Sequence, residues 1–139
     1  MATFVKVNSF VEALAEKVHN LGSDQLKIAL TNTDPTASLT NYAGITSPIA
    51  ATNLSGATPF NVTTSTSAQT SGTYKLVCAD LVLTATGAVG PFRYVVLFND
   101  TAASDEAIAY WDRGSSVTMA NTDTFTIDFD GAGGVLTIA

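Results

Sequence analysis

The spacing of hydrophobic residues predicts one helix near the start of the chain. Apolar side chains recur there every three or four positions, at Phe10, Leu14, Val18 and Leu21. Such spacing places them on one face of a helix. Ser9 and Glu12 match an S-x-x-E capping box, and Gly22 follows the last apolar position as a stop signal. We therefore predict an α-helix over about residues 9–21.

Beyond Gly22 the pattern changes to alternation, which is typical of strands. The candidate strands cover residues 26–31, 60–66, 73–84, 92–98, 108–111, 125–130 and 135–138. Alternation over 26–31 predicts one buried face. The run 92–98 is almost continuously apolar, which predicts a central strand buried on both faces. It should pair with 108–111, and the 73–84 strand should bend near Ala79-Asp80.

These elements predict a mainly β protein. About seven or eight short strands, separated by Gly- and Pro-containing turns, are typical of an antiparallel sandwich or a jelly-roll-like barrel. The N-terminal helix would cover one open edge or end of it. With 139 residues and 46% hydrophobic content, the chain fits a single domain over residues 1–139.

Residues 32–59 form the least regular stretch. They are rich in Thr, Asn, Ser, Gly and Pro, with one strand candidate at 45–50. Two interpretations stay open for this segment. It is either a long excursion over the surface of its own domain or an arm that reaches a neighbouring subunit.

Charge excludes some classes of partner. The net charge is −6, and only 13% of residues are charged. Nucleic-acid phosphates require clustered Lys and Arg, so no nucleic acid is expected as a partner. The same scarcity of cations, and the lack of any long apolar run, argue against a membrane partner. A weakly charged surface favours lateral protein contacts, since few ions need desolvation.

The residues that usually carry catalysis are scarce. His19 is the one histidine and Cys78 the one cysteine. We expect His19 to be partly exposed near the helix end and Cys78 to be a small core residue. With no leader pattern at the N-terminus, the chain is expected to be made in a reducing cytoplasm. We predict no enzymatic activity and no cofactor.

Asp128 and Asp130 are the weak candidates for a metal site. Two carboxylates two residues apart share one face of a strand, and a glycine turn follows. Calcium takes clustered oxygens of this kind. The other ligands of an EF-hand loop are missing, so a solvated strand face leading into a hairpin is the plainer interpretation.

Five segments together resemble a family of small virion proteins of tailed bacteriophages. They are FVEALAEKVHNLGSDQLKIALTNTDP (10–35), SAQTSGTYKLVCAD (67–80), GPFRYVVLFND (90–100), IAYWDRG (108–114) and FTIDFDGAGGVLTIA (125–139). The resemblance extends over essentially the whole chain. It implies a structural component of the particle, with no catalytic or ligand residues.

Within the particle, we expect a decoration (cement) protein that binds the outer surface of the head. The expected partners are further copies of the chain, as a trimer, and the major capsid protein. The alternative is a tail component, either a tube or tip subunit or a receptor-binding fibre domain. Interfaces are expected in the 32–59 segment, the 99–106 loop and a strand-adding arm at Thr3–Val7. The interface candidates are Phe4, Val5, Tyr42, Asn99, Asp100, Tyr110 and Trp111.

Overall fold

Strands dominate the computed structural model, which describes residues 2–139. They are β1 (Thr3–Lys6), β2 (Leu26–Thr31), β3 (Asn61–Val62), β4 (Thr64–Thr70), β5 (Thr73–Cys78), β6 (Leu81–Thr84), β7 (Val89–Asn99), β8 (Ala107–Met119), β9 (Thr124–Ile127) and β10 (Leu136–Ile138). A single short α-helix, α1 (Phe10–Ala15), follows β1. The prediction of a mainly β chain with one N-terminal helix is confirmed.

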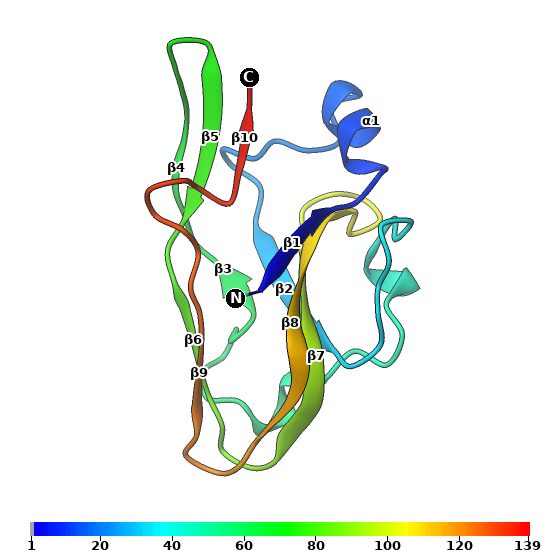
Figure 1. Cartoon of the computed structure of the whole chain (residues 1–139), viewed down its shortest axis with the longest axis vertical. Coiled ribbons are helices and arrows are strands. Elements are labelled where there is room, and N and C mark those ends of the chain that lie inside the picture. Colours follow the sequence, from blue (N-terminus) through cyan, green and yellow to red (C-terminus); the bar gives the residue numbers. More distant parts are fainter. Residues whose placement is uncertain (1) are drawn as a thin grey trace.

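The strands form three antiparallel sheets in a sandwich-like arrangement. The largest has the order β1-β8-β7-β2-β3, and the smaller ones are β10-β5-β4 and β6-β9. The two smaller sheets follow one another along the long axis of the molecule, beside the five-stranded sheet (Figure 1). β5 and β6 are separated at Ala79-Asp80, where the sequence predicted a bend.

Strand β7 lies at the centre of the large sheet. Phe92, Val96 and Leu97 on it are fully buried, and every position from 94 to 99 is buried, whereas Pro91 is exposed and Arg93 partly exposed. Its partner β8 pairs in the predicted place, with Val96 opposite Tyr110. The prediction of a central strand buried on both faces is therefore confirmed for residues 94–98, and Arg93 is the exception within the predicted run.

Strand β2 is also buried on both faces, which corrects the prediction of one exposed face. Ala29 and Thr31 are as inaccessible as Ile28. The 32–59 segment folds back over this side of the sheet. The Ile49 N–H donates to the Leu30 carbonyl at 2.8 Å, and the Thr31 hydroxyl donates to the Thr46 carbonyl at 2.6 Å.

The 32–59 segment is thus an excursion over its own domain, and the strand predicted at 45–50 does not form. Two 3₁₀ turns, η1 (Tyr42–Gly44) and η2 (Ala51–Asn53), give it local order. Leu39, Ile45 and Leu54 anchor it in the core. These buried side chains supply the stability that an unpaired polar loop would lack.

Helix α1 is shorter than predicted, because the chain turns out of it at Lys17. Ser9 makes no capping hydrogen bond through its side chain, so the predicted capping box is absent. Lys17 has φ +67°. The N–H groups of Lys17 and Val18 donate back to the carbonyls of Leu14 and Ala13, at 3.3 and 2.8 Å. This pair of bonds is the Schellman motif, whose left-handed position normally holds glycine.

Lys17→Gly should stabilise the protein. A side chain in the left-handed conformation costs about 1–2 kcal/mol, part of which glycine loses again through its greater freedom in the unfolded chain. We expect a net gain of about 0.5–1 kcal/mol, read as an increase of a few degrees in the thermal midpoint. Lys17→Ala is the control, since it removes the charge and keeps the Cβ. An equal gain from both variants would contradict the explanation.

Candidate interaction surface

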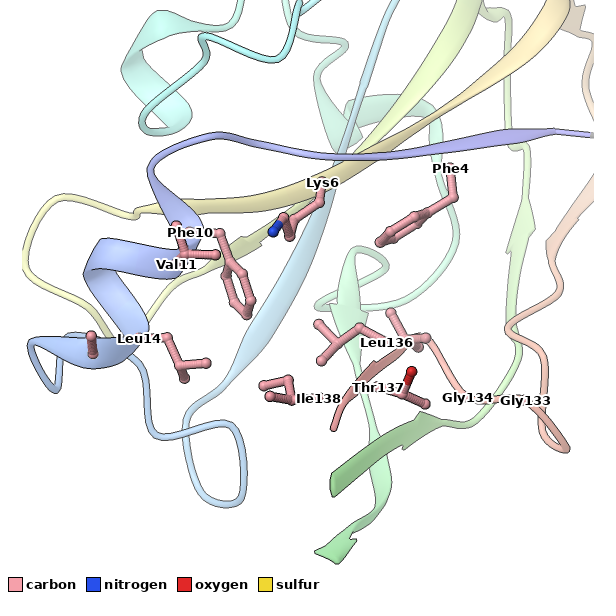
Figure 2. A pocket seen from close by; sticks show the side chains of 12 residues that line it. Phe4, Lys6, Phe10, Val11, Leu14, Gly133, Gly134, Leu136, Thr137 and Ile138 are labelled. Atoms are coloured by element: carbon pink, nitrogen blue, oxygen red, sulfur yellow. The ribbon is translucent and has the colours of Figure 1, made fainter. Parts of the chain in front are cut away.

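A groove runs along the edge of the sandwich where two sheets remain open. Its volume is about 660 Å³. Phe10, Val11 and Leu14 of α1 face Leu136, Thr137 and Ile138 of β10 across it, with Phe4 and Lys6 of β1 alongside (Figure 2). β1 and β10 are both end strands of their sheets. The groove exists because no further strand closes the sandwich between them within residues 2–139.

A second hollow of about 730 Å³ continues this groove along the open edge. It lies mainly between the β1–β8 side and the β9–β10 segment, and it shares Phe4, Gly134 and Val135 with the first. Trp111, Phe125 and Phe129 give it an aromatic lining. We call the two hollows together the open seam.

Phe4 and Trp111 form the junction of the open seam. They stand opposite one another in the β1–β8 pairing. Their ring centroids are 5.4 Å apart at 61°, and Trp111 continues onto Phe129 at 5.7 Å and 66°. Edge-to-face contacts of this kind hold aromatic rings in defined positions. The walls of the seam are therefore preformed.

The groove half of the open seam is unusually apolar for exposed surface. Among residues 2–139, five large hydrophobic side chains are well exposed. Three of them line the groove: Phe4 (40% exposed), Val11 (53%) and Ile138 (39%). Lys6 is the one charged residue of the groove lining. Exposed apolar surface gathered at one place is typical of a site for contacts with other proteins.

The interface candidates from the sequence fall into two groups. Phe4 and Trp111 come together at β1 and β8 in the open seam, whereas Val5 stands opposite Tyr110 on the other face of the sheet. Tyr42 is exposed away from the seam, against Phe98. Asp100 is exposed and pairs with Lys27 at 2.9 Å.

Asn99 and Tyr110 are buried, so the prediction that they are surface contacts is wrong. Tyr110 packs against Tyr94 on the face of the large sheet that the 32–59 segment covers. Burial raises the pKa of its phenol. The Asn99 amide nitrogen donates to Asp24 and to the Nδ1 atom of His19, at 2.6 and 3.1 Å. Its oxygen accepts from the backbone N–H groups of 101 and 102. The Asn99 side chain therefore holds the start of the 99–106 loop in place through hydrogen bonds.

His19 is likewise buried, at 5% exposure, where partial exposure was predicted. Its ring stacks on Phe10 with centroids 5.4 Å apart. Because Nδ1 accepts from Asn99, the proton of the neutral ring sits on Nε2, which has no hydrogen-bond partner among residues 2–139. Burial lowers the pKa of His19, and this effect outweighs the nearby carboxylates of Glu106 and Asp24.

Cys78 is a small core residue, as predicted. It is buried on β5, and burial raises the pKa of its thiol. A buried thiol of this kind is a poor nucleophile. Neither Cys78 nor His19 faces the open seam.

Asp130 builds a turn. Its carboxylate accepts from the N–H groups of Ala132 and Gly133, at 2.9 and 2.8 Å. These bonds, followed by the charge of Lys75, hold the pKa of Asp130 below its usual value. Asp128 is exposed. Within residues 2–139, no cluster of three or more His, Cys, Asp or Glu could hold a metal ion, so the calcium hypothesis gains no support.

Sequence reasoning found part of the open seam. Phe4 and Trp111 were among the interface candidates predicted from the sequence. Val11, Leu14 and Ile138 were assigned to the helix stripe and the last strand, and nothing in their local pattern indicates that both elements border one groove. Val11 carries the one available signal, since it lies beside the apolar stripe of a helix that should cover an edge.

No protein-family model, curated protein or solved structure matches the chain. Among the described residues, no helix has the length and apolar character needed to cross a membrane.

The burial of His19 predicts a loss of stability in mild acid. Its folded pKa lies below the unfolded value of about 6.5, so the unfolded chain binds the proton first and stability falls as pH drops below that value. We expect urea unfolding to show a lower midpoint at pH 5.5 than at pH 7.5. In His19→Gln, which cannot titrate, the decrease should be smaller. An identical pH dependence in both proteins would contradict this prediction.

Proposed function

We propose that the chain is a structural, non-enzymatic subunit of a tailed-phage particle, and specifically a decoration protein that binds the outer surface of the head. The observation that carries the proposal is the open seam. It offers exposed Phe4, Val11 and Ile138 on a protein whose charged fraction is only 13%. Such a surface gains free energy by being covered, and little of that gain is lost to ion desolvation.

The chemistry of the seam supports binding over turnover. Its groove half presents one cation, Lys6, among apolar side chains, and its other half holds aromatic rings with Asp128, Asp130 and Arg113 at the margin. General acid–base catalysis needs a titrating group within reach of a substrate. In the seam, the Asp130 carboxylate is engaged by the backbone N–H groups of its own turn, and Asp128 is exposed to water. The histidine and the cysteine are buried elsewhere.

The placement in a phage particle is supported by the resemblance of five sequence segments to small virion proteins. Four of those segments also line the open seam: 10–35 contributes Val11 and Leu14, and 90–100 contributes Val95. IAYWDRG contributes Trp111, and FTIDFDGAGGVLTIA contributes β10 and Phe129. The resemblance and the candidate interaction surface therefore rest partly on the same residues.

A decoration protein acts by mass action. A folded subunit that binds only the mature shell stabilises that shell by an amount set by its concentration and affinity. Such binding requires a preformed surface and no conformational change in the subunit. A seam held by Phe4–Trp111–Phe129 contacts meets this requirement.

Ile138→Asp should abolish binding to phage heads. The test mixes purified protein with heads that lack it and measures co-sedimentation. A carboxylate in the groove would have to be desolvated on binding, so we expect at least a tenfold loss of affinity. The matched control is Val82→Asp, since Val82 is 56% exposed and lies outside the seam. Both variants should keep the parent circular dichroism spectrum.

Several outcomes would contradict the placement on the head. Assembly of the pure protein into tubes or stacked rings would indicate a tail-tube subunit. Adsorption to host cells, with competition against infection, would indicate a receptor-binding tail domain. Binding that Val82→Asp weakens as much as Ile138→Asp would exclude the seam as the contact surface.

A further inference from the structure

The outer edge of β1 carries unpaired backbone groups. β1 ends the five-stranded sheet, and nothing in residues 2–139 pairs with its other side. The Val7 N–H donates to the Ile108 carbonyl at 3.1 Å, just after Lys6 stands opposite Ala109. In an antiparallel pair the residues alternate between bonding inward and outward. Thr3 and Val5 therefore bond to β8, while Phe4 and Lys6 present N–H and C=O groups outward.

Apart from the shortness of β1, which has four residues, this edge has little protection against pairing with another strand. Proline, bulges and charges are the usual devices that block an exposed edge. β1 contains no proline and pairs with β8 in unbroken register. Lys6 is its single charge, and Phe4 exposes 40% of its surface at the same edge. An apolar, regular edge of this kind is suited to strand addition.

We propose that β1 pairs antiparallel with β1 of a second copy of the chain, centred on Val5. When a twofold axis perpendicular to the sheet relates the two copies of β1, residues that stand opposite one another have their side chains on the same face. Each possible register is therefore centred on one residue of β1 that stands opposite its own copy. Centring on Lys6 would oppose two ammonium groups. Centring on Phe4 needs Ala2, outside β1, for most of its hydrogen bonds. Centring on Val5 lets each Phe4 exchange backbone bonds with Lys6 of the other copy, entirely within β1.

Charge complementarity favours the same register. Phe4 and Lys6 both line the groove, so they lie on one face of the sheet. Across the axis, each Lys6 would stand beside the exposed Phe4 ring of the other copy. A cation over an aromatic face is attracted to it, and the aliphatic stem of lysine covers apolar surface. Lys6 has no carboxylate within ion-pair distance among the described residues, so it is available for this contact.

The proposal rests on the proposed function in treating the open seam as a surface for protein contacts. It assigns the β1 side of that seam to self-association and leaves the β10 side for the shell. The contact is isologous, since each copy offers the same strand.

Cysteine cross-linking tests the register. Val5 would face Val5 of the other copy in a non-hydrogen-bonded pair, with Cα atoms about 4.5 Å apart, which is within disulfide range. Oxidised Val5→Cys should run mostly as a dimer of twice 14.4 kDa on a non-reducing gel. Phe4→Cys alone should stay mostly monomeric, and a mixture of Phe4→Cys with Lys6→Cys should form the mixed dimer. The parent chain is the control, because its one thiol, Cys78, is buried.

Proline substitution tests the contact in the reduced protein. Lys6→Pro removes an outward N–H and leaves the bonds to β8 intact, so the dimer seen by light scattering should become a monomer. Its thermal midpoint should match that of the parent protein diluted until the parent dimer dissociates. Val5→Pro removes an inward N–H and should lower the midpoint. Lys6→Ala keeps the N–H and separates the effect of charge from that of the hydrogen bond.

A monomeric parent with no Val5→Cys cross-link would overturn the proposal, as would efficient self-linking of Phe4→Cys. A trimeric mass without the Val5→Cys link would overturn it as well. None of these results depends on shell binding, which the Ile138→Asp comparison measures separately.

Discussion

The burial of β7 on both faces is the constraint on which the rest of the structure depends. A strand that is apolar on both sides must be covered twice, or its sheet exposes a wide apolar face to water. The β4–β5–β10 and β6–β9 sheets supply one layer. The 32–59 segment supplies cover on the other side, where Tyr42 lies on Phe98 and Ile49 bonds to Leu30. A loop of that length is retained because it completes the core.

The same constraint explains the buried polar cluster at the end of β7. Asn99 is the last residue of β7, where the strand leaves the core and its loop needs hydrogen-bond partners. One amide satisfies two backbone N–H groups and also bonds Asp24 and His19. It therefore ties the segment after α1 to the β7–β8 connection. Buried polar groups are tolerated when they are satisfied in this way, and His19 Nε2 is the exception within residues 2–139 that lies in this cluster.

Features with a local cause could be predicted from the sequence. The continuous apolar run of β7, its pairing with β8 and the break at Ala79-Asp80 all follow from the order of residues along a strand. Features set by distant contacts could not. Both faces of β2 are buried because a segment about fifteen residues further on returns to cover it. The helix ends early because Lys17 adopts a left-handed backbone conformation, which lysine does not favour. The prediction that His19 is partly exposed at the helix end was wrong for the same reason. The groove joins α1 to β10, which are more than a hundred residues apart.

At the open seam the sandwich leaves apolar side chains uncovered. Closing it would need a strand between β1 and β10, and the chain ends its sheets there with two of its shortest strands, of four and three residues. Short end strands limit uncontrolled edge pairing, yet Phe4, Val11 and Ile138 still leave apolar surface in water. Polar residues at these positions would make a monomer more soluble. The burial of β7 does not require apolar side chains there. In the function proposed above, an assembly would cover this surface, and the unpaired edge and the apolar groove would form its contacts.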